Sequence, residues 1–157
     1  MRNRLVLEND DTRFGVSDIL WIHERTGVPL VFDNLHHRLH NPAGWPATEA
    51  IATCLRTWPH GVRPKMHFSS PRTEWIVEER GEGQPPAVRR PRWAYHSDYV
   101  NPFEFIDFLH SALSASTQPV PDFDVMLEVR AKDLALLQLR EDLSRFAPDL
   151  ATRLEPG

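Results

Sequence analysis

The sequence predicts an α/β fold of four parallel strand–helix units, and three observations support this prediction. Four short apolar runs alternate with four stretches of helical periodicity along the 157 residues, and such alternation is typical of parallel βαβ units. The length suits one domain and is too short for two ordinary ones. No glycine-rich phosphate loop follows the first strand, which weakens the case for an open nucleotide-binding sheet. We therefore expect residues 1–157 to form a single domain, whose sheet is either a small open one or half of an eight-stranded barrel.

The predicted elements are short and are separated by polar residues. Strands are expected at residues 4–8, 28–32, 63–68 and 123–128. The first three helices are expected to follow the N-cap residues Ser17, Thr48 and Asn101, and the fourth to span residues 132–146. Residues 72–98 are rich in Gly, Pro, Glu and Arg, and we interpret them as a long loop inside the domain.

The composition indicates a cytoplasmic protein without a membrane partner. Hydrophobic residues make up 41% and charged residues 25%, a balance typical of globular domains, and no apolar run is long enough to span a bilayer. The N-terminus lacks the pattern of a secretory signal. Cys54 is the only cysteine, so we expect a buried helix residue rather than a disulfide or a reactive thiol. A net charge of −4 argues mildly against nucleic acid, although carboxylates of a metal site would contribute to it.

Each predicted strand ends in a side chain that can bind a metal: Glu8, Asp33, His67 and Glu128. In a barrel the carboxyl ends of the strands form one face, where active sites are built. Any one carboxylate there can instead cap the following helix, but four such strand ends predict a metal centre. Histidine together with carboxylates suits Zn²⁺ or Mn²⁺, and oxygen-rich positions favour Mn²⁺ or Mg²⁺.

Two histidines extend this candidate centre. His36 follows Asp33 by three residues, and a tight turn would direct both at one metal, or at two metals bridged by Asp33; the alternative is a polar loop with exposed histidines. His96 lies between the third strand and its helix, where stabilising the loop is as good an explanation as binding a metal. His37 lacks such a spacing argument and is expected to support the site or to lie on the surface.

Lys65 precedes His67 by two residues, so both side chains face the same side of the strand. A lysine in a barrel mouth must be paired or chemically altered, because an isolated buried ammonium is unfavourable. It can neutralise carboxylates, contact a phosphate or bind metal as a carbamate; the alternative is a lysine that extends to the rim.

Successive segments of the chain resemble motifs of the UV damage endonuclease family. These segments are LVLENDD (5–11), PLVFDNLHH (29–37), PKMHFSSP (64–71), HSDYV (96–100), DFDVMLE (122–128) and AKDLAL (131–136). The resemblance extends over nearly the whole chain in order and spacing.

The resemblance implies a TIM barrel that holds divalent metal ions, with Mn²⁺ expected and Zn²⁺ or Mg²⁺ as alternatives. It also implies an enzyme that nicks damaged double-stranded DNA 5′ to UV photoproducts or abasic lesions. The chain would then be a partial TIM barrel, the C-terminal half of a (β/α)₈ barrel with four parallel βα units. Lys65 falls where the family carries a lysine that can be carboxylated. The positions that fall on the family's metal ligands are Glu8, Asp33, His36, His67, His96 and Glu128.

Complete family members have further strands before the first one here, and these supply additional ligands. We therefore expect a missing N-terminal half-barrel or self-association, and an inactive chain in isolation; a truncated gene, a split subunit and a degenerate member all stay open. The third strand–helix connection is longer than a minimal one, and its Arg89, Arg90 and Arg92 are candidates for contact with DNA, although a solvated charge run is commoner. A xylose-isomerase-like sugar isomerase or epimerase and a non-catalytic metal-binding fragment are the alternative functions, and residues 65–71 favour the endonuclease.

Overall fold

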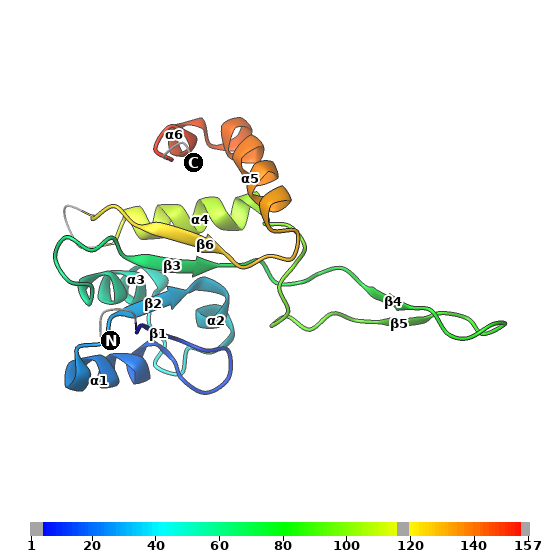
Figure 1. The fold of residues 1–157 in the computed structure, drawn as a ribbon, viewed down its shortest axis with the longest axis horizontal. Helices are drawn as coiled ribbons and strands as arrows, with labels where there is room; N and C mark the ends of the chain where they lie inside the picture. The colour runs from blue at the N-terminus through cyan, green and yellow to red at the C-terminus, as the bar shows by residue number, and fades with distance from the viewer. Residues whose placement is uncertain (1–4, 116–119, 155–157) are drawn as a thin grey trace.

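The computed structural model describes residues 5–115 and 120–154. Its centre is a four-stranded sheet in the order β1-β2-β3-β6, in which every neighbouring pair is parallel. The strands are β1 (Leu7–Glu8), β2 (Leu30–Asp33), β3 (Lys65–Phe68) and β6 (Asp124–Leu127). The predicted parallel α/β arrangement is confirmed, and all four strands run in the same direction, so that their carboxyl ends lie on the same side of the sheet (Figure 1).

Helices follow the strands along the chain. They are α1 (Val16–Thr26), α2 (Asn34–Leu39), α3 (Ala47–Arg56), α4 (Pro102–Leu113), α5 (Asp133–Phe146) and α6 (Pro148–Ala151). Four of them correspond to the predicted helices, whereas α2 and α6 were not predicted. Within the described residues, no helix is long and apolar enough to cross a membrane.

The hydrophobic core lies between the sheet and the helices. Phe32, Met66 and Phe68 are fully buried against α1, α3 and α4, and the Phe68 ring meets the Phe105 ring edge-on with centroids 4.9 Å apart. Because side chains alternate across a strand, these residues send their sequence neighbours to the opposite face. That face carries Lys65, which is exposed, and Met126, which is 52% exposed, so the helices cover one face of the sheet and leave the other open.

The helix starts differ from the sequence prediction at two of three positions. Helix α1 begins one residue before Ser17, because Gly15 is its N-cap and the Asp18 carboxylate accepts a hydrogen bond from the Gly15 amide at 2.8 Å. Helix α3 likewise begins before Thr48, with Pro46 as the N-cap. The Asn101 cap is confirmed, since its side chain accepts hydrogen bonds from two backbone amides of the first turn of α4.

The first strand is shorter than predicted. Strand β1 contains two residues, and Leu5 and Val6 precede it as exposed, irregular chain. Arg4, where the predicted strand began, lies outside the described residues.

Residues 71–96, which we name the arm, are not the loop that the sequence predicted. They contain β4 (Ile76–Glu78) and β5 (Ala87–Arg89), an antiparallel pair that projects away from the body (Figure 1). The arm consists of an outgoing chain segment, which follows β3, and a returning chain segment, which leads back to the body. The two segments also pair at the base of the arm, through a bridge between Pro71 and His96. Strands of only three residues give too short an alternation to be recognised in a sequence rich in Gly, Pro and charge.

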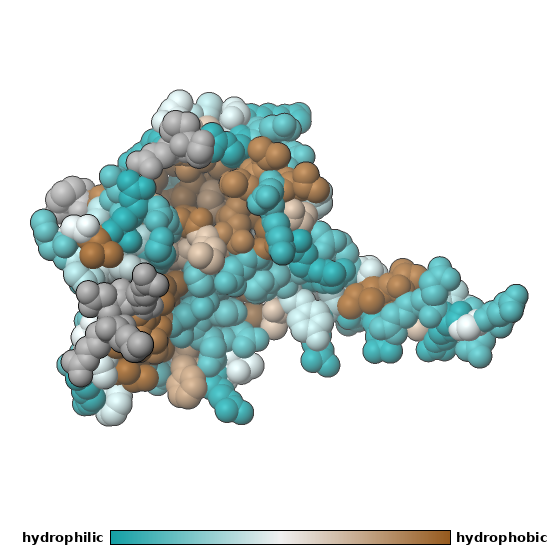
Figure 2. All heavy atoms as spheres, viewed as in Figure 1, coloured by the Kyte–Doolittle hydropathy of each residue, from teal (hydrophilic) through white to brown (hydrophobic). Residues whose placement is uncertain are grey.

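An apolar groove of about 540 Å³ lies between β6 and the helices α4, α5 and α6. Leu109, Leu139 and Leu143 contribute to its lining. Figure 2 shows hydrophobic residues around this hollow beneath the C-terminal helices. Strand β6 borders the groove and pairs only with β3 among the described residues.

Candidate metal centre

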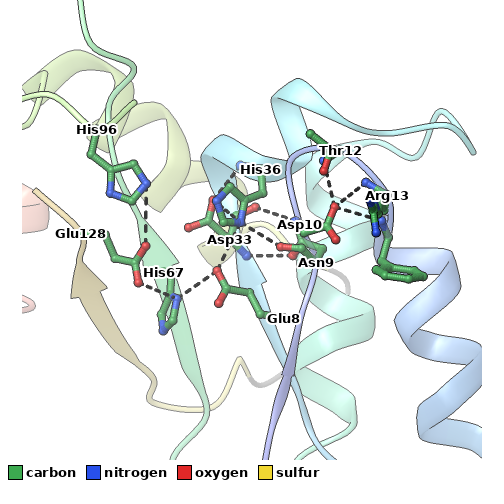
Figure 3. Close-up of polar contacts among 11 residues, drawn as sticks. Glu8, Asn9, Asp10, Thr12, Arg13, Asp33, His36, His67, His96 and Glu128 are labelled. Carbon is green, nitrogen blue, oxygen red and sulfur yellow. Dashed lines mark hydrogen bonds and ion pairs between the residues drawn. The ribbon is translucent and has the colours of Figure 1, made fainter. Parts of the chain in front are cut away.

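The four strand-end residues that the sequence singled out come together in the structure. Glu8 ends β1, Asp33 ends β2, His67 lies in β3, and Glu128 follows β6. One nitrogen or oxygen atom of each lies within 4.8 Å of the corresponding atoms of the other three. The parallel register explains this, because it sets Asp33 directly opposite His67. Figure 3 shows the side chains converging above the ends of the strands.

The distances within this cluster suit a cation better than a hydrogen-bond network. His67 Nδ1 lies 3.1 Å from Glu8 Oε1 and 3.2 Å from Glu128 Oε1. These contacts are not aligned as hydrogen bonds: His67 Nδ1, Glu8 Oε1 and Asp33 Oδ2 are buried without a hydrogen-bond partner. Ligand atoms at right angles around an ion, each about 2.1 Å from it, lie about 3 Å apart. The donor set therefore fits a divalent metal ion.

His36 joins the cluster because a helix starts immediately after β2. Asp33 is the N-cap of α2, and its Oδ1 accepts a hydrogen bond from the His36 amide at 2.7 Å. The His36 Nδ1 then lies 3.3 Å from Glu8 Oε1 and 3.7 Å from Asp33 Oδ1. The predicted tight turn is thus the first turn of a helix. His37, one residue on, is buried away from the cluster with its Nε2 3.1 Å from the Trp45 carbonyl oxygen.

His96 lies at the edge of the cluster. Its Nε2 is 3.9 Å from Glu128 Oε2, and its ring centroid is 6.4 Å from that of His36. It reaches this position because the returning chain of the arm pairs with Pro71. The candidate ligand His96 is therefore near the other five, with one ion-pair contact to them.

Lys65 is not brought to a cluster carboxylate. It begins β3, and its ammonium donates to Asp124 Oδ2 at 2.9 Å, with half of the side chain exposed. Within the described residues, Asp124 is its only ion-pair partner. The lysine pairs with Asp124 on the neighbouring strand and not with a cluster carboxylate, and its catalytic role stays a prediction.

Asn9 is a residue that the sequence did not single out. Its side chain is fully buried, and its amide nitrogen donates to the Asp33 carbonyl at 3.1 Å while its amide oxygen accepts from the Asp33 amide at 2.9 Å. The Asn9 carbonyl oxygen lies 2.9 Å from His36 Nδ1. The Asn9 side chain thus joins the ends of β1 and β2, and Asn9 contacts two cluster residues, Asp33 and His36. The available signal was an asparagine directly after the strand-end glutamate.

The cluster perturbs the pKa values of its own members. The contact between its Nδ1 and Glu8 Oε1 raises the pKa of His36 to about 9, against the opposing effect of burial. Burial acts to raise the pKa of Glu8, but His36 and His67 outweigh it and hold that pKa at about 2. Burial raises the pKa of Asp33 to about 6, and the charges of Glu8 and Glu128 add to this. The histidines and carboxylates of the cluster thus shift one another's pKa values toward their charged forms, whereas burial favours the neutral form of Asp33.

The three candidate arginines lie on the returning chain of the arm. The Arg89 guanidinium pairs with Glu78 across the hairpin at 2.7 Å. The Arg92 guanidinium lies over the Tyr95 ring, 5.7 Å from its centroid. Arg90 and Arg92 are both exposed.

Comparison with known proteins identifies the family. The family model described as UV-endonuclease UvdE matches residues 1–151. The chain belongs to the UvdE family. Among curated relatives, the UV DNA damage endonucleases of Bacillus mycoides (strain KBAB4) and Bacillus cereus (strain B4264) are 32% and 34% identical over 145 and 146 residues. The crystal structure of SacUVDE matches with a TM-score of 0.64 and 34% identity, covering 90% of this chain.

The UvdE relatives are considerably longer than this chain. The two Bacillus proteins match 92% of this chain, but the match covers 39% of their own length, and it covers 40% of SacUVDE. The resemblance found in the sequence motifs is thereby confirmed at the level of the family. The chain spans about two fifths of the length of the relatives it matches.

Proposed function

We propose that this chain is the metal-binding part of a DNA repair endonuclease and forms the C-terminal half of its (β/α)₈ barrel. The observation that carries the proposal is the convergence of Glu8, Asp33, His67 and Glu128 at the carboxyl ends of four parallel strands. Membership of the UvdE family supports endonuclease activity over a sugar isomerase, although both classes place carboxylates and histidines at strand ends. Helices cover only one face of the sheet, and this supports the half-barrel. In a TIM barrel the helices lie on the outer face of the sheet, the other face forms the barrel interior, and the active site lies at the carboxyl ends of the strands.

The proposed ligands are the six residues that gather at the strand ends. Glu8, Asp33, Glu128 and His67 would hold the ion, and His36 and His96 would complete the coordination or hold a second ion. Three carboxylates and one imidazole in the first four residues form an oxygen-rich set that favours Mn²⁺, with Zn²⁺ or Mg²⁺ as alternatives. When bound, the metal would polarise the scissile phosphate and lower the pKa of a bound water.

The chain's own residues would fix this geometry. Asp33 is held on both sides, because its carboxylate caps α2 and its backbone is bound by Asn9. Glu8 is adjacent to Asn9 in the chain and shares that support. We propose that Lys65 acts nearby as a carbamate or as a cation toward phosphate, once it leaves the exposed pair with Asp124. The substrate we propose is duplex DNA, cut 5′ to UV photoproducts or abasic lesions.

We propose that a second half-barrel completes the site. Strands β1 and β6 each pair with one neighbour among the described residues. An open edge of this kind offers unpaired backbone groups to another strand, and the apolar groove beside β6 offers surface for further packing. The partner would be an N-terminal half-barrel or, failing that, a second copy of this chain.

Metal binding by matched variants tests the proposal. We expect purified protein to bind Mn²⁺ in a calorimetric titration, and the double variant Glu8→Gln/Glu128→Gln to lose that binding, because two anionic ligands become neutral. The control Glu24→Gln/Glu141→Gln removes two exposed carboxylates outside the cluster and is expected to bind Mn²⁺ normally. Nicking of irradiated duplex is then measured after adding an N-terminal half-barrel from a relative. A folded protein that binds neither Mn²⁺ nor Zn²⁺ would contradict the metal centre, and metal binding without nicking in the completed barrel would favour the non-catalytic fragment.

A further inference from the structure

The arm is structurally connected to the metal centre at its root. The Ser97 amide donates to the Ser70 carbonyl at 3.0 Å, and the Arg72 amide donates to the Tyr95 carbonyl at 2.7 Å. These bonds continue the pairing of β4 with β5 down to the end of β3. The returning chain then supplies His96, whose contact with Glu128 is drawn in Figure 3. A ligand held on the returning chain is therefore held beside the cluster.

Charge is divided unevenly between the two chains of the arm. The outgoing residues 72–82 contain four glutamates and two arginines, whereas the returning residues 87–95 contain three arginines and no acidic residue. Arg89 is neutralised by Glu78 at 2.7 Å. Arg90 and Arg92 are exposed, and neither has a carboxylate partner within the described residues. The positive charge is thus concentrated on the segment that leads into the metal centre.

Aromatic side chains accompany these arginines. Trp93 is 59% exposed and Tyr95 is 46% exposed, on the same returning segment. Arginine next to exposed aromatic rings is a combination that binds nucleic acid, because guanidinium groups contact phosphates and rings pack against sugars and bases. In a chain of net charge −4, a local cationic surface reduces the repulsion between the protein and the phosphates.

We propose that the returning chain of the arm, through Arg90 and Arg92, binds the phosphate backbone of duplex DNA beside the metal centre. This inference rests on the proposed endonuclease function and assigns to it a substrate-binding surface. Arg90 precedes His96 by six residues, which is about 20 Å of extended chain at most. At about 3.4 Å per base pair, the contact lies within about six base pairs of the scissile phosphate. Arg89 is assigned instead to the hairpin, through its pair with Glu78.

The alternative binding partner of the arm would be a protein. Val77 and Val88 face each other across the hairpin and are 60% and 59% exposed, and Figure 2 shows a hydrophobic patch on the arm. This pair could pack against another chain. The charge division favours DNA for the returning chain, and the experiment includes the protein partner as an outcome.

Salt-dependent DNA binding tests the inference. Affinity of the Mn²⁺-loaded chain for a fluorescent duplex is measured by anisotropy over a range of NaCl concentrations, for the wild type and for Arg90→Gln/Arg92→Gln. We expect the variant to bind on the order of tenfold more weakly and its slope of log affinity against log salt to fall by about 1.8, about 0.9 for each lost phosphate contact. The control Arg25→Gln/Arg145→Gln removes two exposed arginines that also lie over aromatic rings, on α1 and α5, and is expected to bind as the wild type does.

Three results would overturn the inference: a wild type that binds no duplex, an arginine variant with unchanged affinity and slope, or a control variant that weakens binding equally. A Val77→Thr/Val88→Thr variant that changes the oligomeric state in light scattering, while the arginine variant keeps full DNA affinity, would assign the arm to a protein partner. Mn²⁺ titration of the same samples separates this inference from the proposed function. If the arginine variant loses DNA affinity but binds Mn²⁺ normally, DNA binding by the arm is supported. If the variant loses DNA affinity in a protein that binds no Mn²⁺ at all, DNA binding by the arm is still supported, but the proposed endonuclease function is contradicted.

Discussion

Replacing Asn9 by alanine should destabilise the fold and weaken the metal centre together. The substitution removes two hydrogen bonds to the Asp33 backbone, and the partners left behind are an amide and a carbonyl of a fully buried residue. Each buried group without a partner costs about 1–3 kcal/mol. Water entering the space of the lost side chain would satisfy part of this demand, so we expect a loss of about 2–4 kcal/mol in the free energy of unfolding. A domain is typically stable by about 5–15 kcal/mol, so the loss is large.

The effect on metal binding follows from what Asn9 holds in place. Its side chain positions Asp33, and its carbonyl oxygen contacts the His36 ring. Loss of a group that orients metal ligands typically lowers affinity about 10–100-fold. Asn9→Asp should be worse than Asn9→Ala, because an aspartate oxygen would face the Asp33 carbonyl where an amide now donates, and a charge would be buried.

Asn41 provides a matched control. Its side chain makes the same pair of bonds, donating to the Trp45 carbonyl at 2.8 Å and accepting from the Trp45 amide at 3.0 Å, but in a partly exposed loop. Urea unfolding in EDTA and Mn²⁺ calorimetry are measured for both variants. Asn41→Ala should lose less stability, since water can replace its bonds, and should bind Mn²⁺ normally. Equal destabilisation by the two variants, with unchanged Mn²⁺ affinity for Asn9→Ala, would refute the positioning role of Asn9.

Three further predictions concern the rest of the molecule. Lys65→Ala should lower metal occupancy or activity of the completed barrel far more than Lys132→Ala, while the loss of its half-exposed pair with Asp124 should cost less than about 1 kcal/mol in urea unfolding; equal and negligible effects on the metal would reduce Lys65 to a rim lysine. Burial raises the pKa of the Cys54 thiol to about 12, so iodoacetamide should label it near neutral pH only when urea unfolds the chain, and rapid labelling of the native protein would show that α3 is not packed as described. Residues 1–157 alone should not nick irradiated duplex, and nicking should appear in proportion to complex formation with an N-terminal half-barrel; lesion-specific nicking by a verified monomer would contradict this.

The strand ends of the candidate site could be predicted because their placement follows from two local facts. Parallel strands align their carboxyl ends, and the side chain at each end was readable from where an apolar run stopped. The register that sets Asp33 opposite His67 then completes the cluster without further information. The same reasoning failed to give the position of Lys65, because its partner Asp124 is 59 residues away in sequence.

The supports of the site could not be predicted from local pattern. Asn9 acts through bonds to a residue 24 positions away, so nothing in its immediate neighbours distinguishes it from a loop asparagine. Helix α2 has six residues and begins at Asp33 without a polar spacer, which made its first turn resemble a loop. Gly15 and Pro46 are the N-caps in place of Ser17 and Thr48, and neither makes a side-chain capping hydrogen bond, so capping preference did not determine where these helices begin.

The residues of the candidate centre bring like charges close together at the strand ends. Asp33 is buried between Glu8 and Glu128, and burial with these charges raises its pKa to about 6. The contact with Glu8 raises the pKa of His36 to about 9, so a protonated imidazole at this position would offset part of the repulsion. A divalent ion would supply positive charge at the centre of the cluster and would be a partner for the buried Asp33 Oδ2, which has no hydrogen-bond partner. In the proposed metal centre, ion binding and folding would therefore be coupled, because the candidate ligands are also at the ends of all four strands.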